Sequence, residues 1–233
     1  MAAYYDKIML DGRYYDYPAI ARYLAGAARH ARRLLELGCG TGLVIDELLR
    51  QQPGYETVAG VDMTPGMLAA ARDRLACWPQ VFLHEQDVTR MRLPSGGFDV
   101  AWSYGGPWYF TPSSGDGGYV MVSHISRDEG NTAGLERVAA HTAPGGRLLL
   151  GVQAPHSAYT RPLPGGYTYA QSLAPRDGGF RKRYLLLGPD GGTLVDQVLD
   201  YRVYDLATAL RMLAQAGLHP ARTGGLFLEF TRR

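Results

Sequence analysis

The sequence predicts an α/β fold with a doubly wound, mostly parallel seven-stranded sheet and an added antiparallel hairpin arm. Three observations predict it. Short apolar segments alternate with segments of helical periodicity through the first two thirds of the chain, and the first apolar segment runs into the glycine-rich turn "LLELGCGTGL". The last third instead contains two long segments separated by "PDGG", which is typical of a hairpin. Alternating strands and helices of this length indicate a parallel sheet covered on both faces.

Composition indicates one domain over residues 1–233. A chain of 233 residues with 46% apolar residues can bury a full core. Its formal net charge of +2, without a long basic block, does not favour a nucleic-acid partner. No run approaches the roughly 20 apolar residues of a membrane span, and the N-terminus lacks the apolar stretch of a signal peptide. Cys39 and Cys77 have no metal-ligand spacing and no reason to pair, which fits a reducing, cytoplasmic setting. We expect no metal, and either a monomer or a homodimer.

The first two thirds divide into alternating elements. Thr64 and Pro65 suit the start of the third helix, because Thr favours the N-cap and Pro the first helical position. The expected helices cover 17–31, 43–52, 65–76 and 133–146, and the expected strands cover 33–37, 57–63, 81–87, 98–104 and 147–153.

The last third is predicted to form the arm and the end of the sheet. Segments 180–188 and 193–205 form the hairpin, which we expect to lie over the active site. Asp205 can cap a final helix that stops at Gly217, and a strand over 224–233 follows. The Gly/Pro-rich stretches 111–119 and 161–179 are expected to be binding loops.

The glycine turn predicts a site where a ligand approaches the main chain closely. Gly38, Gly40 and Gly42 can adopt left-handed dihedral angles. The dinucleotide fingerprint G-x-G-x-x-G is not matched, because Leu43 stands where its third glycine would fall. Asp62 ends the next strand and can accept the hydroxyls of a ribose, which fits a dinucleotide as well as another cofactor that contains a ribose. Asp87 ends the third strand beside apolar Val88, a pair suited to an adenine ring and its amino group.

The motifs "ELGCGTG", "GVDMTPGML", "EQDV", "FDVAWSYGG" and "APGGRLLL" together resemble the class I S-adenosylmethionine-dependent methyltransferases over residues 32–153. The resemblance implies the Rossmann-like methyltransferase fold, with S-adenosylmethionine as cofactor and S-adenosylhomocysteine as product. It places the three glycines under the methionine and ribose portions of the cofactor. Asp62 would hold the ribose with Met63 against the adenine ring, and Asp87 would read the adenine beside Val88. The tyrosine-rich N-terminus resembles the segment that covers the cofactor in small-molecule members. The implied cofactor-binding set is Tyr5, Tyr17, Glu36, Gly38, Gly40, Gly42, Asp62, Met63, Asp87, Val88 and Ser103.

The resemblance also implies a division of the chain. Residues 1–31 form a helical segment that covers the cofactor, and 32–153 form the cofactor-binding core. Residues 154–204 form the substrate loop and hairpin arm, and 205–233 the final helix and strand.

The end of the fourth strand, where the substrate meets the methyl group in this family, reads "SYGGPWYF". It lacks the Asn/Asp-Pro-Pro-aromatic motif of enzymes that methylate nucleic-acid bases, and the acid that holds magnesium in catechol-type enzymes. A small-molecule substrate is therefore expected, with no nucleic acid, membrane or metal. Trp108 and Tyr109 are predicted to line its pocket, and Arg161 to meet an acidic group.

Two histidines are the candidate general bases. His124 and His156 follow the fourth and fifth strands at the edge where open α/β sheets bind ligands. Tyr104 is the next candidate, and catalysis by proximity alone stays open.

The expected function is methyl transfer from S-adenosylmethionine to an oxygen or nitrogen atom of a small metabolite, of the kind made in antibiotic biosynthesis. Two alternatives remain. One is an enzyme of this fold that binds the cofactor without transferring methyl, and the other is a binding protein without activity.

Overall fold

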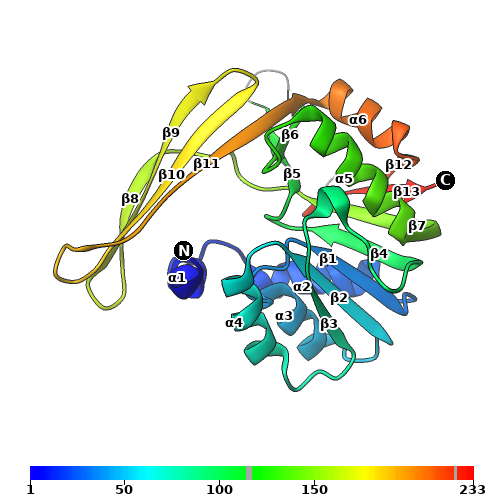
Figure 1. Ribbon diagram of the computed structural model, residues 1–233, viewed down its shortest axis with the longest axis horizontal. Coiled ribbons are helices and arrows are strands. Elements are labelled where there is room, and N and C mark those ends of the chain that lie inside the picture. The colour runs from blue at the N-terminus through cyan, green and yellow to red at the C-terminus, as the bar shows by residue number, and fades with distance from the viewer. Residues whose placement is uncertain (114–116, 223–224) are drawn as a thin grey trace.

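The computed structural model describes residues 1–113, 117–222 and 225–233 and contains two sheets (Figure 1). The larger has seven strands in the order β12-β13-β7-β4-β1-β2-β3, and the other has six in the order β5-β6-β11-β10-β9-β8. The seven-stranded sheet lies with its helices in one body, and much of the second sheet extends away from it as an arm (Figure 1). The predicted α/β fold with a mostly parallel seven-stranded sheet is confirmed.

The centre of the larger sheet is β1, which pairs in parallel with both β2 and β4. The chain moves outward from β1 through β2 to β3, then crosses to β4 on the other side, so the strand order reverses between β1 and β4. Ligands bind at such a switch point, beyond the carboxyl ends of the strands. The antiparallel strands β13 and β12 complete the sheet. Its strands are β1 Arg33–Leu37, β2 Thr57–Asp62, β3 Val81–Glu85, β4 Phe98–Ser103, β7 Thr142–Gly151, β12 Leu218–Arg222 and β13 Phe227–Arg232.

Helices cover both faces of this sheet. Apolar side chains of α2, α3 and α4 pack in one core cluster, and those of α5 and α6 in another. Asp205 caps α6 by accepting the Thr208 N–H at 2.7 Å, as predicted. Asp16, which was not predicted as a cap, caps α2 by accepting the Ala19 N–H at 2.9 Å. None of the helices in the described ranges is long and apolar enough to cross a membrane. The helices are α1 Ala2–Asp6, a π-helical turn Lys7–Asp11, α2 Tyr17–Ala27, α3 Leu43–Gln51, α4 Pro65–Leu75, a 3₁₀ turn Val88–Arg90, α5 Asp128–His141 and α6 Leu206–Gln215.

The arm is larger than the predicted hairpin. The hairpin itself is β10 paired with β11, but the stretch 161–179, expected to be a binding loop, largely forms strands. Its glycines mark tight turns between strands, since Gly165, Gly166 and Gly178 have positive φ angles. Its Pro162 lies on β8, an edge strand, where a missing N–H is tolerated. The six strands are β5 Trp108–Pro112, β6 Tyr119–Ser123, β8 Tyr159–Leu163, β9 Tyr167–Arg176, β10 Gly179–Leu187 and β11 Thr193–Asp205.

Several boundaries also differ from the sequence prediction. The helix expected over 17–31 ends at Ala27, and the helix expected over 133–146 runs from Asp128 to His141, after which β7 begins. In the stretch 111–119, residues 114–116 lie outside the described residues, as does Gly224 at the start of the predicted last strand. Strand β12 was not predicted, because "LHPAR" is short and contains a proline.

Candidate active site

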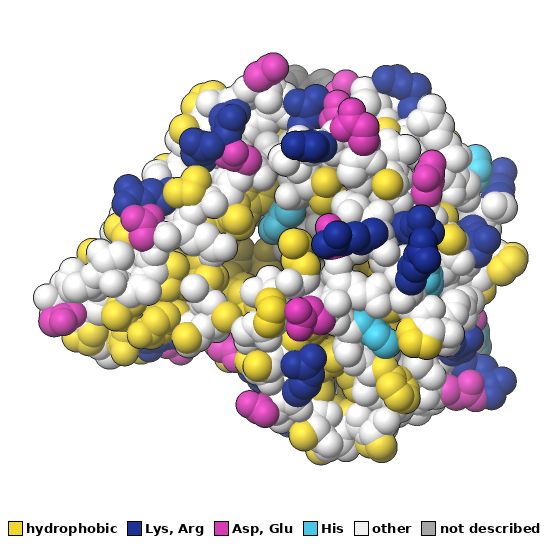
Figure 2. All heavy atoms as spheres, viewed as in Figure 1, with side chains coloured by type: hydrophobic (Ala, Val, Ile, Leu, Met, Phe, Trp, Pro, Cys, Tyr) yellow, Lys and Arg dark blue, Asp and Glu magenta, His cyan; other side chains and the backbone are white. Residues whose placement is uncertain are grey.

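A cavity of about 350 Å³ lies beyond the carboxyl ends of β1, β2 and β4. The segments after β3 and β7 also line it, and the N-terminal segment and the arm add further parts of its wall, with Tyr5 from the former and Tyr184 from the latter. Hydrophobic side chains gather along the arm and around the hollow between the arm and the rest of the molecule (Figure 2). The cavity therefore lies at the switch point of the sheet and is enclosed by segments far apart in the sequence.

The three glycines of the turn have different structural roles. All three have positive φ angles, of 70° at Gly38, 53° at Gly40 and 79° at Gly42. A Cβ at Gly38 would lie 2.7 Å from the Gly106 Cα, and one at Gly42 would lie 2.7 Å from the Leu75 side chain. A Cβ at Gly40 meets nothing closer than the Tyr5 ring at 3.9 Å. Gly38 and Gly40 line the cavity, whereas Gly42 allows the turn to pack against α4.

Asp62 connects the end of β2 to the glycine turn. Its carboxylate accepts the Gly40 N–H at 2.9 Å through one oxygen and the Thr64 N–H at 2.9 Å through the other. Thr64 lies at the N-cap of α4, as expected, although its own side chain forms no capping bond. Met63 follows with 67% of its surface exposed, and both Asp62 and Met63 line the cavity. An acceptor and an apolar side chain thus lie side by side at the ligand-facing end of β2.

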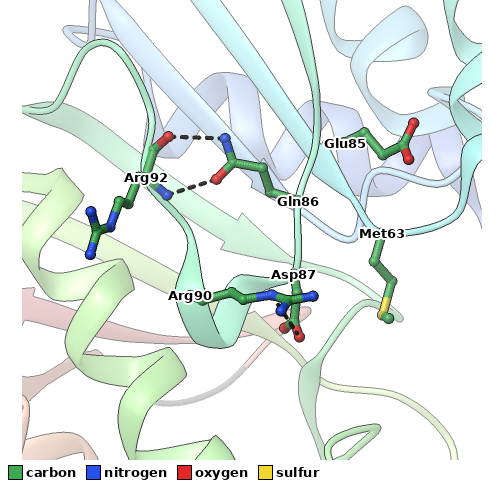
Figure 3. Close-up of a pocket in the computed structure, with 6 residues that line it drawn as sticks. All are labelled: Met63, Glu85, Gln86, Asp87, Arg90 and Arg92. Atoms are coloured by element: carbon green, nitrogen blue, oxygen red, sulfur yellow. Dashed lines mark hydrogen bonds and ion pairs between the residues drawn. The ribbon is translucent and has the colours of Figure 1, made fainter.

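A groove continues from the cavity past β3 (Figure 3). Figure 3 shows Asp87 and Met63 on opposite sides of it, with Arg90 beside Asp87. Asp87 accepts the Thr89 N–H at 2.9 Å and lies 3.8 Å from Arg90, and Val88 lines the adjoining cavity. Gln86 fixes the loop through two hydrogen bonds with the Arg92 backbone, of 2.9 Å and 2.7 Å. The groove has the carboxylate and flanking apolar surface that an adenine would need.

Buried polar groups near the glycine turn lack partners within the described part of the chain. They are Tyr17 Oη, Glu36 Oε2, Ser103 Oγ and Gln153 Nε2. Burial raises the pKa of Glu36 well above its ordinary value. Unpaired buried polar groups are costly, and a ligand that carries an ammonium and a carboxylate would satisfy such groups. Of these groups only Gln153 lines the cavity and would meet the carboxylate of such a ligand directly, whereas Tyr17, Glu36 and Ser103 do not line it. The fit of S-adenosylmethionine therefore depends on Gln153, Gly40, Asp62 and Asp87.

His124 follows β6 and lines the cavity. Its ring contacts are edge-on to Tyr109, at 5.9 Å between centroids, and to Tyr201, at 4.7 Å. Within the described residues its ring nitrogens have no hydrogen-bond partner. Burial, and then the charge of Lys182, lower the pKa of His124 to about 4, so the imidazole is neutral near pH 7.

His156 also lines the cavity, but both of its ring nitrogens are engaged. Nε2 lies 2.6 Å from Tyr109 Oη, and Nδ1 lies 3.2 Å from Lys182 Nζ. Burial, and then the charges of Lys182 and His124, lower the pKa of His156 to about 3. The two candidate bases therefore differ, because only His124 has an unoccupied ring nitrogen.

Three other predicted site residues lie outside the cavity lining. Trp108, expected in a pocket loop, is fully buried on β5, and its Nε1–H donates to Asn131 Oδ1 at 2.7 Å. Tyr104 packs edge-on against Tyr15. Arg161 is half-buried beside the rings of Tyr159 and Tyr169, and two of its nitrogens have no partner among the described residues. Of the predicted substrate residues, only Tyr109 lines the cavity.

Four tyrosines and a lysine that close the site are not among the residues predicted from the sequence. Tyr14, Tyr15, Tyr184 and Tyr201 line the cavity, and Lys182 lies buried behind it. The alternation in "FRKRY" is the signal that points to Lys182 and Tyr184, because residues two apart on a strand share a face. Using this signal required knowing which face of the arm is buried.

Residues 34–116 match the model of a family described as a methyltransferase domain. A dTDP-3-amino-3,6-dideoxy-alpha-D-glucopyranose N,N-dimethyltransferase of Streptomyces fradiae is 28% identical over 154 residues, which cover 64% of this chain and 52% of that protein. An uncharacterized methyltransferase of Schizosaccharomyces pombe is 39% identical over 70 residues, 30% of this chain and 25% of that protein. The chain thus spans between a quarter and about half of the length of these curated relatives.

Solved structures share the fold along nearly the whole chain. DesVI of Streptomyces venezuelae superposes with a TM-score of 0.73 at 23% identity and covers 99% of this chain and 97% of its own. An amino pentose methyltransferase of Micromonospora echinaspora, solved with S-adenosylmethionine bound, gives a TM-score of 0.69 at 24% identity and covers 95% and 94%. Residues 34–116 therefore match a methyltransferase domain, and the chain shares the fold of these solved methyltransferases, which is the fold that the sequence motifs implied.

Proposed function

We propose that this protein transfers a methyl group from S-adenosylmethionine to the amino nitrogen of a small molecule, with an amino sugar as the substrate class. One observation carries the proposal. Gly40, Asp62 and Asp87, which follow three different strands, line one cavity together with His124 and Tyr109. The Streptomyces fradiae relative, named as an amino-sugar N,N-dimethyltransferase, supports a nitrogen acceptor over an oxygen acceptor.

The cofactor would be held along the edge of the larger sheet. Asp62 would accept the ribose hydroxyls, Asp87 and Val88 would hold the adenine, and Gly40 leaves room for the chain of the cofactor to cross the turn. When bound, S-adenosylmethionine supplies an electrophilic methyl group on a cationic sulfonium. The tyrosine faces around the cavity would favour that cation by roughly 0.5 to 2 kcal/mol.

The chain's own contribution to the reaction is mainly positioning and exclusion of water. Tyr5 from the N-terminal segment and Tyr184 and Tyr201 from the arm enclose the cavity. A small molecule held there reacts as in an intramolecular step, which is the main source of acceleration in an in-line displacement. Neutral His124 would accept a hydrogen bond from the substrate amine and orient its lone pair toward the methyl group.

The direct test is incubation with S-adenosylmethionine and dTDP-3-amino-3,6-dideoxyglucose. We expect mass spectrometry to detect methylated sugar nucleotide and an equal or larger amount of S-adenosylhomocysteine. Cofactor consumed without methylated product would favour an enzyme that does not transfer methyl. Failure to bind S-adenosylhomocysteine in calorimetry would contradict the proposal as a whole.

Replacing Asp62 by alanine is expected to weaken S-adenosylhomocysteine binding by about 1 to 3 kcal/mol, because the ribose hydroxyls and the Gly40 N–H lose their shared acceptor. Isothermal titration calorimetry measures the change. Asp73→Ala is the matched control, since Asp73 is exposed on α4 and outside the cavity lining. Unchanged affinity in folded Asp62→Ala protein would remove Asp62 from the binding site.

Replacing His124 by alanine is expected to lower kcat/KM about tenfold, the worth of one hydrogen bond to the substrate. Because the pKa of His124 is about 4, the ratio of wild-type to variant kcat/KM should stay constant from pH 5.5 to pH 8. His30→Ala serves as the control, because His30 is exposed and lies outside this cavity. A ratio that rises with an apparent pKa between 6 and 7 would show that His124 titrates as a general base.

A further inference from the structure

Lys182 is a fully buried lysine on β10, the central strand of the hairpin arm. Its neighbours Arg181 and Arg183 point to the other face of the strand and pair with Asp200 and Asp196. Lys182 forms no ion pair within the described ranges of the chain. A lysine buried without a carboxylate is costly, so its amine must serve other groups.

The amine begins a chain of hydrogen bonds that leads into the cavity. Lys182 Nζ lies 3.1 Å from Tyr14 Oη and 3.2 Å from His156 Nδ1, above the ring of Tyr184 at 4.6 Å. His156 Nε2 then lies 2.6 Å from Tyr109 Oη. Tyr109 is in the cavity wall, so three side chains connect the arm to the place where a small molecule would bind.

The order of donors along this chain follows from the chemistry of a neutral imidazole. Such a ring has one nitrogen that donates and one that accepts. Lys182 Nζ lies 3.2 Å from Nδ1. In its charged form the lysine amine can only donate, so Nδ1 is then the acceptor and the ring proton is on Nε2. Nε2–H therefore donates to Tyr109 Oη, and the hydroxyl proton of Tyr109 is not used by His156. Tyr109 Oη has no other hydrogen-bond partner within the described residues.

We propose that Lys182 is a positioning residue that holds His156 as the Nε2–H tautomer and thereby directs the hydroxyl proton of Tyr109 into the cavity, toward an oxygen atom of the bound small molecule. Without Lys182, the other tautomer becomes available. Nε2 would then accept from Tyr109, and the hydroxyl proton would point away from the cavity. The low pKa of His156, about 3, supports a ring that carries a single proton throughout the neutral range.

The proposal also assigns different roles to the two histidines. With both ring nitrogens engaged, His156 has no lone pair for a substrate proton. His124 keeps that possibility, because it lines the cavity and its ring nitrogens have no hydrogen-bond partner in the described part of the chain. The substrate contact rests on the proposed function above, whereas the tautomer of His156 does not.

The tautomer can be measured in the cofactor-free protein by two-bond ¹H–¹⁵N NMR of the histidine rings at pH 6, where Lys182 is charged and His156 is neutral, with His156→Gln used to assign the signals. We expect Nδ1 of His156 to resonate as an unprotonated nitrogen and Nε2 as a protonated one. Lys182→Met should give the reverse tautomer or a mixture, while Arg183→Met, on the opposite face of the same strand, should match the wild type. A His156 ring protonated on Nδ1 in the wild type, or unchanged in Lys182→Met, would overturn the proposal.

The contact with substrate is tested with dTDP-3-amino-3,6-dideoxyglucose. Tyr109→Phe and Lys182→Met should each lower kcat/KM about tenfold, and the double variant should lose little more than either single one, because both act through one hydroxyl proton. Losses that multiply would overturn the coupling. A wild-type protein that methylates no amino sugar contradicts the proposed function instead, and the NMR result then decides the tautomer by itself.

Discussion

Truncating Trp108 to alanine is expected to lower the free energy of unfolding by about 3 to 5 kcal/mol, the usual cost of removing a buried tryptophan. Trp108 is fully buried, and its ring lies so close to α5 that a Cβ at Gly134 would come within 2.7 Å of it. Truncation also breaks the hydrogen bond from Nε1 to Asn131 Oδ1, although Ser123 still donates to that oxygen. Guanidinium denaturation followed by circular dichroism measures the loss.

The same substitution decides between core and pocket roles for this residue. We expect folded Trp108→Ala protein to bind S-adenosylhomocysteine nearly as the wild type does, because Trp108 does not line the cavity. Trp108→Phe is the matched variant, since it keeps much of the buried apolar surface and should lose less stability than alanine. A loss below about 1 kcal/mol combined with weaker substrate binding would return Trp108 to the substrate pocket.

The meeting of the expected cofactor-binding residues Gly40, Asp62 and Asp87 in one cavity could be predicted, because their signals are local. Gly40, Asp62 and Asp87 lie at or just beyond the carboxyl ends of β1, β2 and β3, and the carboxyl ends of parallel strands meet at one edge of a sheet. His124 and His156 were found by the same rule. The separate roles of the three glycines could not be read from the sequence, because they depend on what lies opposite each one. Gly106 and Leu75 oppose Gly38 and Gly42, and both are distant in sequence.

The substrate half could not be predicted in the same way. Tyr184 and Tyr201 face the cavity from β10 and β11, and their hydroxyl groups bond to each other. Which residues of a strand face a cavity depends on the register and on what covers each face of the sheet. The prolines and glycines of the stretch 161–179 favour a loop, whereas the structure forms strands β8 and β9 there. The width of the arm, and with it the buried face of β10, therefore could not be predicted.

The geometry of strand β5 explains why its adjacent residues Trp108 and Tyr109 have opposite roles. Successive side chains of a strand point to opposite faces. Trp108 packs in the core cluster with the apolar residues of α5, and Tyr109 lies in a separate cluster with Val122 and Tyr201 of the arm. The arm sheet therefore continues the wall of the cavity, and a cation buried in it is close enough to act on the site.

Replacing Lys182 by methionine is expected to change how stability depends on pH. Burial lowers the pKa of Lys182 to about 7, whereas a lysine in an unfolded chain has a pKa of about 10.4. Between these values the unfolded chain binds a proton that the folded chain does not, so the stability of the wild type rises with pH, and below pH 7 this penalty is fully present. From pH 7 to pH 9.5 the free energy of unfolding of the wild type should increase by about 3 kcal/mol relative to that of Lys182→Met.

Taking the difference between the two proteins cancels the titration of Cys39 and the buried tyrosines, which both proteins contain. Arg183 is exposed and paired with Asp196 in the wild type, so the stability of Arg183→Met should still rise with pH. Urea denaturation at four pH values measures it, and parallel stability curves for wild type and Lys182→Met would show that Lys182 keeps its proton when buried.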